Sequence, residues 1–217
     1  ADLDHEGVQV DNGQHVFLGC CTAYRDLLRL LGVAHLTHVQ APMAVAIRDR
    51  AGRQGTLRDA RMPAPLHMLP SFVTYPLLTT RQKLAALRAL SAIALMAPAA
   101  RDRLDDVTFG EWLADHGQSA QAIANFWDVI VLPTCNERSD RVSAALALYV
   151  FQEGFFRRRG GAAVGWSRVG LTELIDPAAR RFLARHHVRL ITDAAVVGAG
   201  GDEVTLSTGE ILPADGV

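Results

Sequence analysis

The residue types best suited to chemistry lie near the start of the chain, where Asp11, Gly13, Gln14 and His15 interrupt two short apolar runs. The apolar runs on either side predict two strand-like halves joined by a tight turn. Because glycine has no side chain, Gly13 lets the backbone approach another group closely. The segment therefore predicts a turn that faces a bound cofactor. An ordinary turn with a structural histidine fits the same residues, and that alternative stays open.

The composition is that of a folded protein with an apolar leaning, since 49% of the 217 residues are hydrophobic and 21% are charged. A chain of this length can bury a sizeable core, as one large domain or two small ones. The net charge of -1 provides no broad basic field, which argues against a nucleic-acid partner. Cys20, Cys21 and Cys135 offer no paired disulfide framework, so a reducing cytoplasm is the simplest setting.

The sequence predicts no secretory signal and no membrane-spanning helix. Its first residues are acidic, whereas a secretory signal begins with positive charge. The longest apolar run, residues 84–97, contains Arg88 and is shorter than the roughly 20 residues that span a bilayer, so it predicts a buried helix. The aromatic and basic run at residues 155–159 fits either contact with anionic lipid headgroups or a solvated loop.

Apolar spacing and capping signals predict an alternation of helices and short strands, with a capping box formed by Thr108 and Glu111 at one helix start. The expected helices cover residues 21–31, 80–97, 108–116, 119–132, 139–151 and 171–185, the last as one piece or two. The expected strands cover residues 43–47 and 55–58, as a hairpin, then 188–192, 195–198, 203–207 and 211–217. Pro133 is expected to end the fourth helix. The core positions expected in the fifth are Val142, Leu146, Tyr149 and Val150.

Other candidate motifs favour structural interpretations. The glycines at 198–201 are followed by a strand pattern, where a dinucleotide fingerprint needs a helix, so they predict a hairpin turn. Residues 165–170 miss the spacing of a nucleophile elbow and are expected to form a loop. The histidine pairs at 35 and 38 and at 186 and 187 have no supporting ligands at metal-site spacing, so no metal site is predicted.

Several runs along the chain resemble one family, the hydroxysqualene dehydroxylases, which are squalene-associated FAD-dependent desaturases within the flavin-containing amine oxidase and phytoene desaturase superfamily. The runs are D-N-G-Q-H-x-x-x-G-C at 11–20, F-W-D through L-P-T-C-N-E at 126–137, V-F-Q-E-G-F at 150–155 and V-G-L-T-E-L at 169–174. The tail from 188 to 215 is similar to the family's returning strands. The resemblance therefore covers nearly the whole chain.

The resemblance implies a mixed fold, α+β or α/β, in which a substrate-binding domain with several helices and a small mixed sheet accompanies part of a glutathione-reductase-like FAD domain. It implies a flavin-facing turn and first helix at 1–40, a mostly helical substrate-binding domain with a β-hairpin at 41–165, and a returning FAD-domain segment at 166–217. The family's G-x-G-x-x-G run and its C-terminal FAD segment have no counterpart in these residues. We therefore expect an excised fragment that does not retain FAD by itself.

The resemblance also implies roles for individual residues. Gly13, Gln14 and His15 match the turn beside the flavin, and Ala194 matches a position whose backbone contacts adenine. Helical residues that would wall a long apolar substrate cavity are Trp127, Pro133, Asn136, Tyr149 and Phe151. Plain core packing is an equally good interpretation of each of these five.

The implied reaction is the reductive dehydroxylation of a C30 isoprenoid, hydroxysqualene, in the cytoplasm, with peripheral contact to the inner face of the membrane as a further option. Loss of hydroxide needs a general acid, and histidine has an ordinary pKa near 6.5. His15 is the histidine in the flavin-facing turn, while Asp11 could orient it or act as the acid itself. A carotenoid-type desaturase and a non-catalytic helical lipid-binding module remain alternatives.

Overall fold

The computed structural model describes residues 3–5, 8–11, 16–49 and 51–215. Its α-helices are α1 (Thr22–Leu30), α2 (Leu69–Val73), α3 (Thr80–Leu95), α4 (Pro98–Asp102), α5 (Phe109–Asp115), α6 (Ala120–Ala122), α7 (Asp128–Cys135), α8 (Ala144–Phe151) and α9 (Leu171–Arg185). Short 3-10 turns are η1 (Ala34–Leu36) and η2 (Leu66–Met68), and two π-helical segments are η3 (Ile123–Trp127) and η4 (Gln152–Phe156). The strands are β1 (Leu3–His5), β2 (Val8–Val10), β3 (Val16–Leu18), β4 (Thr37–Val39), β5 (Ala44–Arg48), β6 (Gln54–Arg58), β7 (Val164–Ser167), β8 (Val196–Ala199), β9 (Glu203–Leu206) and β10 (Ile211–Pro213).

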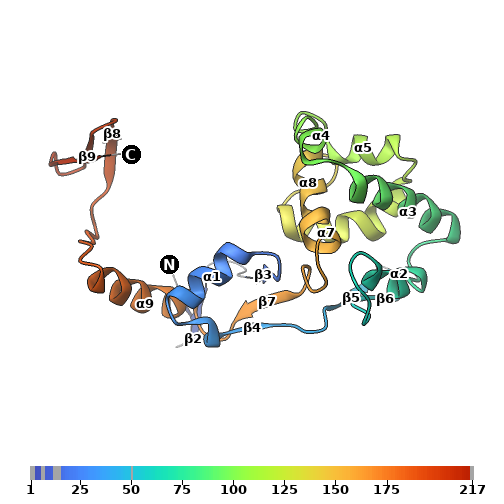
Figure 1. The fold of residues 1–217 in the computed structure, drawn as a ribbon, viewed down its shortest axis with the longest axis horizontal. Helices are drawn as coiled ribbons and strands as arrows, with labels where there is room; N and C mark the ends of the chain where they lie inside the picture. Colours follow the sequence, from blue (N-terminus) through green and yellow to red (C-terminus); the bar gives the residue numbers. More distant parts are fainter. Residues whose placement is uncertain (1–2, 6–7, 12–15, 50, 216–217) are drawn as a thin grey trace.

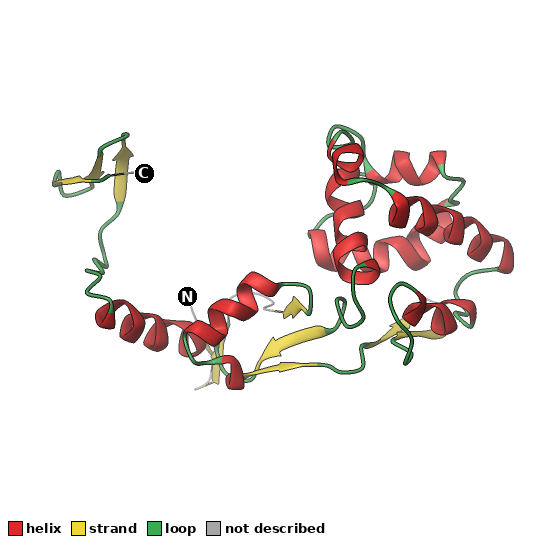
Figure 2. Ribbon diagram, in the orientation of Figure 1, coloured by secondary structure: helices red, strands yellow, loops and turns green. Residues whose placement is uncertain are grey.

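The molecule has a helical body built from α2 to α8, joined by extended strands to a thinner part that holds α1 and α9 (Figure 1). A small hairpin sheet, β8 to β10, lies at the C-terminal end beyond α9 (Figure 2). Among the described residues all strand pairings are antiparallel, in the orders β1-β2, β3-β7-β4, β5-β6 and β10-β9-β8. This mixture of helices and small sheets confirms the fold class predicted from the sequence.

The strand β7 corrects the loop expected at residues 165–170. It lies between β3 and β4, and pairs Gly165 with both Phe17 and Val39. The Phe17 ring lies over Gly165, where an added Cβ would come within 2.5 Å of it. Local sequence does not reveal such a strand, because its partners are about 130 to 150 residues away along the chain and supply the ladder that makes it a strand.

Helix α9 is anchored on α1 by a small apolar cluster. Leu28, Val33, Leu174 and Ala178 are buried in this cluster. The helix is a single piece that continues through Pro177, which settles the alternative left open by the sequence. Beyond it, residues 188–192 are irregular rather than a strand, and the remaining tail forms β8, β9 and β10 close to the expected positions.

The core of the helical body surrounds large aromatic side chains. Trp127 and Leu148 are fully buried, and Phe109 and Phe151 pack their rings at 5.9 Å from each other. The predicted capping box at Thr108 is confirmed, and the hairpin of β5 and β6 also forms as expected.

Two details of the predicted helices are wrong. Helix α7 continues past Pro133 to Cys135 and ends at Asn136, whose φ of 54° is left-handed. Proline removes one backbone hydrogen bond of the helix, but its fixed φ is compatible with helical geometry. A helix therefore ends at a proline only where packing against neighbouring elements does not stabilise the next turn. In α8 the exposed residues include Leu146 and Tyr149, because small alanines at 144 and 147 turn inward with Leu148 and Phe151. The helix is apolar on every side, so spacing alone does not choose its buried face.

Candidate functional site

An apolar cavity of about 200 Å³ opens in the helical body between α2 and α3. Its inner wall is aromatic and aliphatic: Phe72, Phe126, Ile130, Phe151, Phe155 and Phe156. Its outer wall combines residues of η2 and α2 with residues of α3: Pro65, Leu66, Met68, Leu69, Leu87, Leu90, Ser91 and Ala94. Leu57 of β6 completes the lining, and Ser91 is the only polar residue among the described residues that line the cavity. Such a surface suits a hydrocarbon chain and gives a polar ligand little to bind.

Both π-helical segments contribute to this wall. Phe126 belongs to η3, while Phe155 and Phe156 belong to η4. A π-helical turn contains an extra residue and is found disproportionately at functional sites. The coincidence of two such segments at one cavity marks it as the candidate substrate site of the helical body.

The five residues expected to wall a substrate cavity take three different positions. Phe151 lines the cavity and Trp127 lies behind it, with its ring centroid 5.1 Å from that of Phe151. The Trp127 indole N–H donates to Gln118 Oε1 at 2.9 Å, so its polar atom is already satisfied inside the core. Pro133 and Asn136 are exposed at the end of α7. Tyr149 is also exposed, and the Arg101 guanidinium lies 5.0 Å from its ring centroid.

Sequence reasoning missed most of the cavity lining. Ser91 and Ala94 lie among larger apolar residues of α3, and their small side chains create space for the opening of the cavity. Small residues at helical spacing within an apolar run were a sequence signal that could have indicated this part of the cavity. No sequence signal paired α3 with the segment 65–69, because that contact is made only by tertiary packing.

The predicted flavin-facing turn, with Gly13, Gln14 and His15, lies outside the described residues. Its neighbours are described: Asp11 Oδ1 accepts a hydrogen bond of 2.9 Å from the backbone N–H of Leu171, the first residue of α9. The carboxylate of Asp11 therefore lies at a helix N-terminus, where a negative charge is favourable. This contact fixes residue 11 against the start of α9.

The sheet next to that turn provides a face that fits a flat ring system. Val16 pairs with Trp166, and Trp166 pairs with His38 on the other side. Val16 is 46% exposed and Trp166 is 40% exposed, while the rings of Trp166 and His38 lie 4.5 Å apart. An apolar and aromatic row that begins where residues 12–15 end is chemically suited to the flat flavin ring, so the residues present fit that group.

Ala194 lies in the irregular segment before β8 and is half-buried. Its backbone is not part of a strand, so it can offer hydrogen-bonding groups to a ligand. Among the residues that the structure describes, no group of three or more histidine, cysteine, aspartate or glutamate side chains could hold a metal ion. In the same part of the chain, every helix is too short or too polar to cross a membrane.

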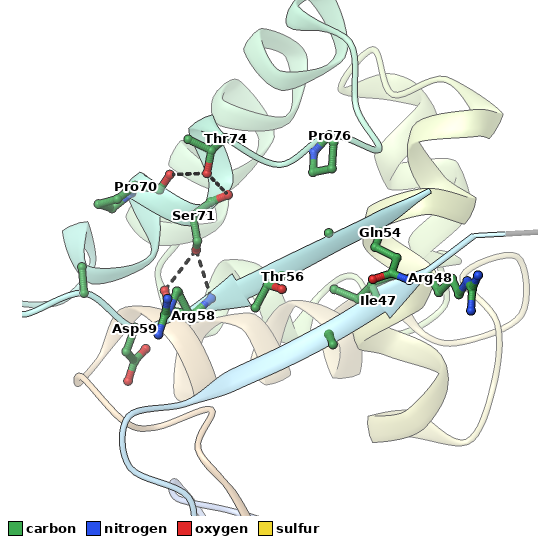
Figure 3. Close-up of a pocket in the computed structure, with 13 residues that line it drawn as sticks. Ile47, Arg48, Gln54, Thr56, Arg58, Asp59, Pro70, Ser71, Thr74 and Pro76 are labelled. Atoms are coloured by element: carbon green, nitrogen blue, oxygen red, sulfur yellow. Dashed lines mark hydrogen bonds between the residues drawn. The ribbon is translucent and has the colours of Figure 1, made fainter. Parts of the chain in front are cut away.

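A second opening, a cleft of about 940 Å³, runs between the β5-β6 hairpin and α2. Figure 3 shows Ser71 bridging to the backbone of Arg58, with hydrogen bonds of 3.0 and 3.1 Å. Thr56, Thr74 and Arg48 line it together with apolar residues such as Ile47 and Pro76, so its lining is mixed and carries more polar side chains than the apolar cavity.

A buried pair of titratable groups lies at the end of β6. His67 Nε2 is 3.6 Å from Asp59 Oδ1, and both side chains are almost completely buried. Burial lowers the pKa of His67 below its ordinary value, Asp59 acts to raise it, and the charge of Arg159 acts to lower it. Burial has the largest effect, so His67 is held neutral near neutral pH.

This lowered pKa predicts a loss of stability on acidification. Below about pH 6.5 the unfolded chain binds a proton at residue 67 while the folded chain resists it, so unfolding is favoured as the pH falls. We expect the free energy of unfolding, measured by denaturant titration, to decrease from pH 7.5 to 5.5 more steeply in the wild type than in His67→Gln. Equal slopes for the two proteins would show that His67 titrates normally in the folded state.

The fold and the site together define a class: a protein part in which a small sheet with two packed helices is joined to a helical body that has an apolar cavity. Comparison with known proteins narrows this class. The profile of the family described as flavin containing amine oxidoreductase matches residues 2–217. This chain belongs to the flavin-containing amine oxidoreductase family.

Relatives within that family include carotenoid enzymes. The chain is 25% identical over 207 residues to a zeta-carotene desaturase of Synechocystis sp., covering 87% of this chain and 42% of the relative. It is 31% identical over 164 residues to a chloroplastic/chromoplastic zeta-carotene desaturase of Solanum lycopersicum, covering 69% of this chain and 27% of the relative. The chain thus spans less than half the length of these curated relatives.

Solved structures agree on the fold. A triple mutant from a redesign of cofactor binding in putrescine oxidase matches 99% of this chain and 47% of its own, with a TM-score of 0.60 and 18% identity. The wild-type enzyme bound to putrescine matches with a TM-score of 0.57 and 17% identity, over 100% of this chain and 46% of its own.

Proposed function

We propose that the full-length protein is an FAD-dependent oxidoreductase that converts hydroxysqualene, a C30 isoprenoid alcohol, to squalene and water. The observation that carries this proposal is the apolar cavity, in which Ser91 supplies the one polar side chain among the described lining residues. At about 200 Å³ the cavity is below the roughly 300 Å³ at which drug-sized ligand pockets begin. It therefore holds one part of a long chain while the rest extends through the mouth between α2 and α3.

The residues of the turn have separate tasks in this proposal. Gly13 lets the backbone approach the flavin, Gln14 follows it in the same turn, and Asp11 fixes the start of the turn through its bond to Leu171 N–H. His15 gives a proton to the departing hydroxyl oxygen, which leaves as water. When bound and reduced, the flavin supplies the hydride that completes squalene.

A carotenoid desaturase is the second candidate, because the curated relatives described above are zeta-carotene desaturases. It would use the same cavity for a hydrocarbon substrate and would run in the oxidative direction. The reductive reaction is preferred for one reason: the D-N-G-Q-H run at residues 11–15 resembles the dehydroxylase form of the turn.

Turnover assays of the full-length protein distinguish the candidates. With FAD and a chemical reductant under anaerobic conditions, we expect hydroxysqualene to be consumed and squalene to be formed, measured by gas chromatography with mass spectrometry. Desaturation of zeta-carotene with an electron acceptor, and no squalene, would establish the second candidate instead. Tight binding of an isoprenoid with no product in either assay would point to a non-catalytic lipid-binding protein.

Flavin retention gives a separate prediction for residues 1–217 expressed alone. These residues contain no G-x-G-x-x-G run to hold the pyrophosphate, and the glycines at 198–201 form the end of β8 and its turn. We expect a colourless preparation. Flavin absorbance near 450 nm at about one equivalent per chain would contradict this expectation.

A further inference from the structure

The segment that forms the mouth of the apolar cavity carries only positive charge. Residues 60–100 include Arg61, Arg81, Lys83 and Arg88 but no aspartate or glutamate, although the whole chain has 23 acidic residues and 22 basic ones. Arg61, Arg81 and Arg88 are exposed, and no ion pair involves them among the described residues. This part of the surface is therefore a local basic field on a protein of nearly neutral charge.

The same segment exposes large apolar side chains. Leu66 and Leu69 are exposed at the mouth of the cavity, and Val73 is exposed at the end of α2. On α3, Leu84 is 57% exposed and Leu95 is 87% exposed. A single exposed leucine is ordinary, but several that lie next to one another usually mark a surface that something else covers.

The exposed leucines of α3 and the cavity mouth lie on one face of that helix. Leu84, Ser91 and Leu95 are spaced by seven and then four residues, which places them above one another along an α-helix. Ser91 lines the cavity, whereas Leu84 and Leu95 do not. Arg88 lies four residues after Leu84, so the apolar stripe has a basic residue beside it. The stripe therefore continues the cavity lining outward onto the surface.

We propose that the face formed by residues 61–95, named here the α2-α3 face, docks on an anionic lipid bilayer and places the cavity mouth against the membrane. The leucines enter the boundary between headgroups and acyl chains, and the three arginines lie among the anionic headgroups. Burial of apolar area and attraction of basic residues act together in such surface binding. An apolar isoprenoid then passes from the bilayer into the cavity without crossing water, a step that rests on the proposed function.

The α2-α3 face is better suited to a membrane than residues 155–159, for which the sequence left lipid contact and a solvated loop as alternatives. Phe155 and Phe156 line the cavity, so their rings are directed inward. Arg157 forms an ion pair with Glu153, and Arg158 donates to the backbone oxygen of Gly19. These partners leave that run less suited to lipid headgroups than residues 61–95.

The test measures binding of the full-length protein to vesicles by flotation. One set of vesicles contains 40% phosphatidylglycerol in phosphatidylcholine, and the other contains phosphatidylcholine alone. The charge variant is Arg81→Gln with Arg88→Gln, and the apolar variant is Leu84→Ser with Leu95→Ser. A matched control carries the same kinds of change elsewhere, as Arg185→Gln on α9 and Leu146→Ser on α8, both at exposed positions.

We expect the wild type and the control to bind the anionic vesicles alike and the neutral vesicles much more weakly. The charge variant should lose about 25-fold in vesicle affinity, since each of its two basic residues contributes about fivefold near an anionic surface. The apolar variant should also bind less, even at high salt, where the charge contribution is screened. Wild-type binding by both variants, or equal binding to neutral vesicles, would overturn the proposal. A change in oligomeric state by light scattering, without vesicle binding, would assign the face to a second copy of the chain and would overturn it as well.

Turnover separates this inference from the proposed function. With hydroxysqualene embedded in anionic vesicles the charge variant should lose activity, whereas with detergent-dispersed substrate it should match the wild type. Vesicle binding without turnover of any isoprenoid would leave the docking face standing and refute the proposed function. Turnover of dispersed substrate by a protein that binds no vesicles would refute the docking face and leave the proposed function standing.

Discussion

Replacing His15 with glutamine is expected to lower turnover of hydroxysqualene by about two to four orders of magnitude in the full-length protein. Hydroxide is a poor leaving group, so the reaction depends on a proton delivered to the oxygen, and glutamine cannot deliver one. Glutamine retains a hydrogen-bonding side chain of similar length, so FAD should stay bound. The measurement is single-turnover oxidation of the reduced enzyme, with flavin content read from the same absorbance spectrum.

Two further variants test the reasoning behind this expectation. His35→Gln changes an exposed histidine of η1 and should behave as wild type. Asp11→Ala should reduce turnover by loosening the turn, whereas Asp11→Asn keeps an oxygen that can accept from Leu171 N–H and should retain more activity. If His15→Gln reacts at the wild-type rate with an unchanged pH profile, the acid is not His15. Loss of activity in Asp11→Asn equal to that in Asp11→Ala would then identify Asp11 as the acid.

Replacing Trp127 with alanine is expected to lower the free energy of unfolding by about 3–5 kcal/mol, as for other large aromatic residues in a packed core. Its side chain is fully buried and contacts Phe109, Phe126 and Phe151 ring to ring. Such a loss is a large share of the stability of an ordinary domain. Denaturant titration monitored by circular dichroism measures it directly.

Trp127→Phe separates packing from the indole hydrogen bond. It keeps most of the ring volume but leaves the buried Gln118 Oε1 without its donor, which should cost about 1–3 kcal/mol. Because Trp127 lies behind the cavity wall, the phenylalanine variant should keep the wild-type KM for the isoprenoid. A KM raised tenfold in a variant that is still stably folded would show that Trp127 contacts substrate.

The sequence by itself determined the local elements whose causes are local. The capping box at Thr108 and Glu111 was predictable because both partners lie within one turn of helix. The hairpin of β5 and β6 was predictable because alternating strands flank a short polar connection. The run at residues 11–20 and the later runs led to the right superfamily, because they are short motifs that can be read directly from the sequence.

Only the tertiary structure decided which residues meet. Strand β7 exists because β3 and β4 pair with both of its edges, and neither partner is near it in sequence. The buried face of α8 is chosen by its neighbours, since the helix itself is apolar all round. The same holds for the cavity, which forms where residues 65–69 and α3 leave a gap over Phe126 and Phe151. Local periodicity does not predict long-range packing, because each of these contacts becomes favourable only when the partner element, distant in sequence, is already in place.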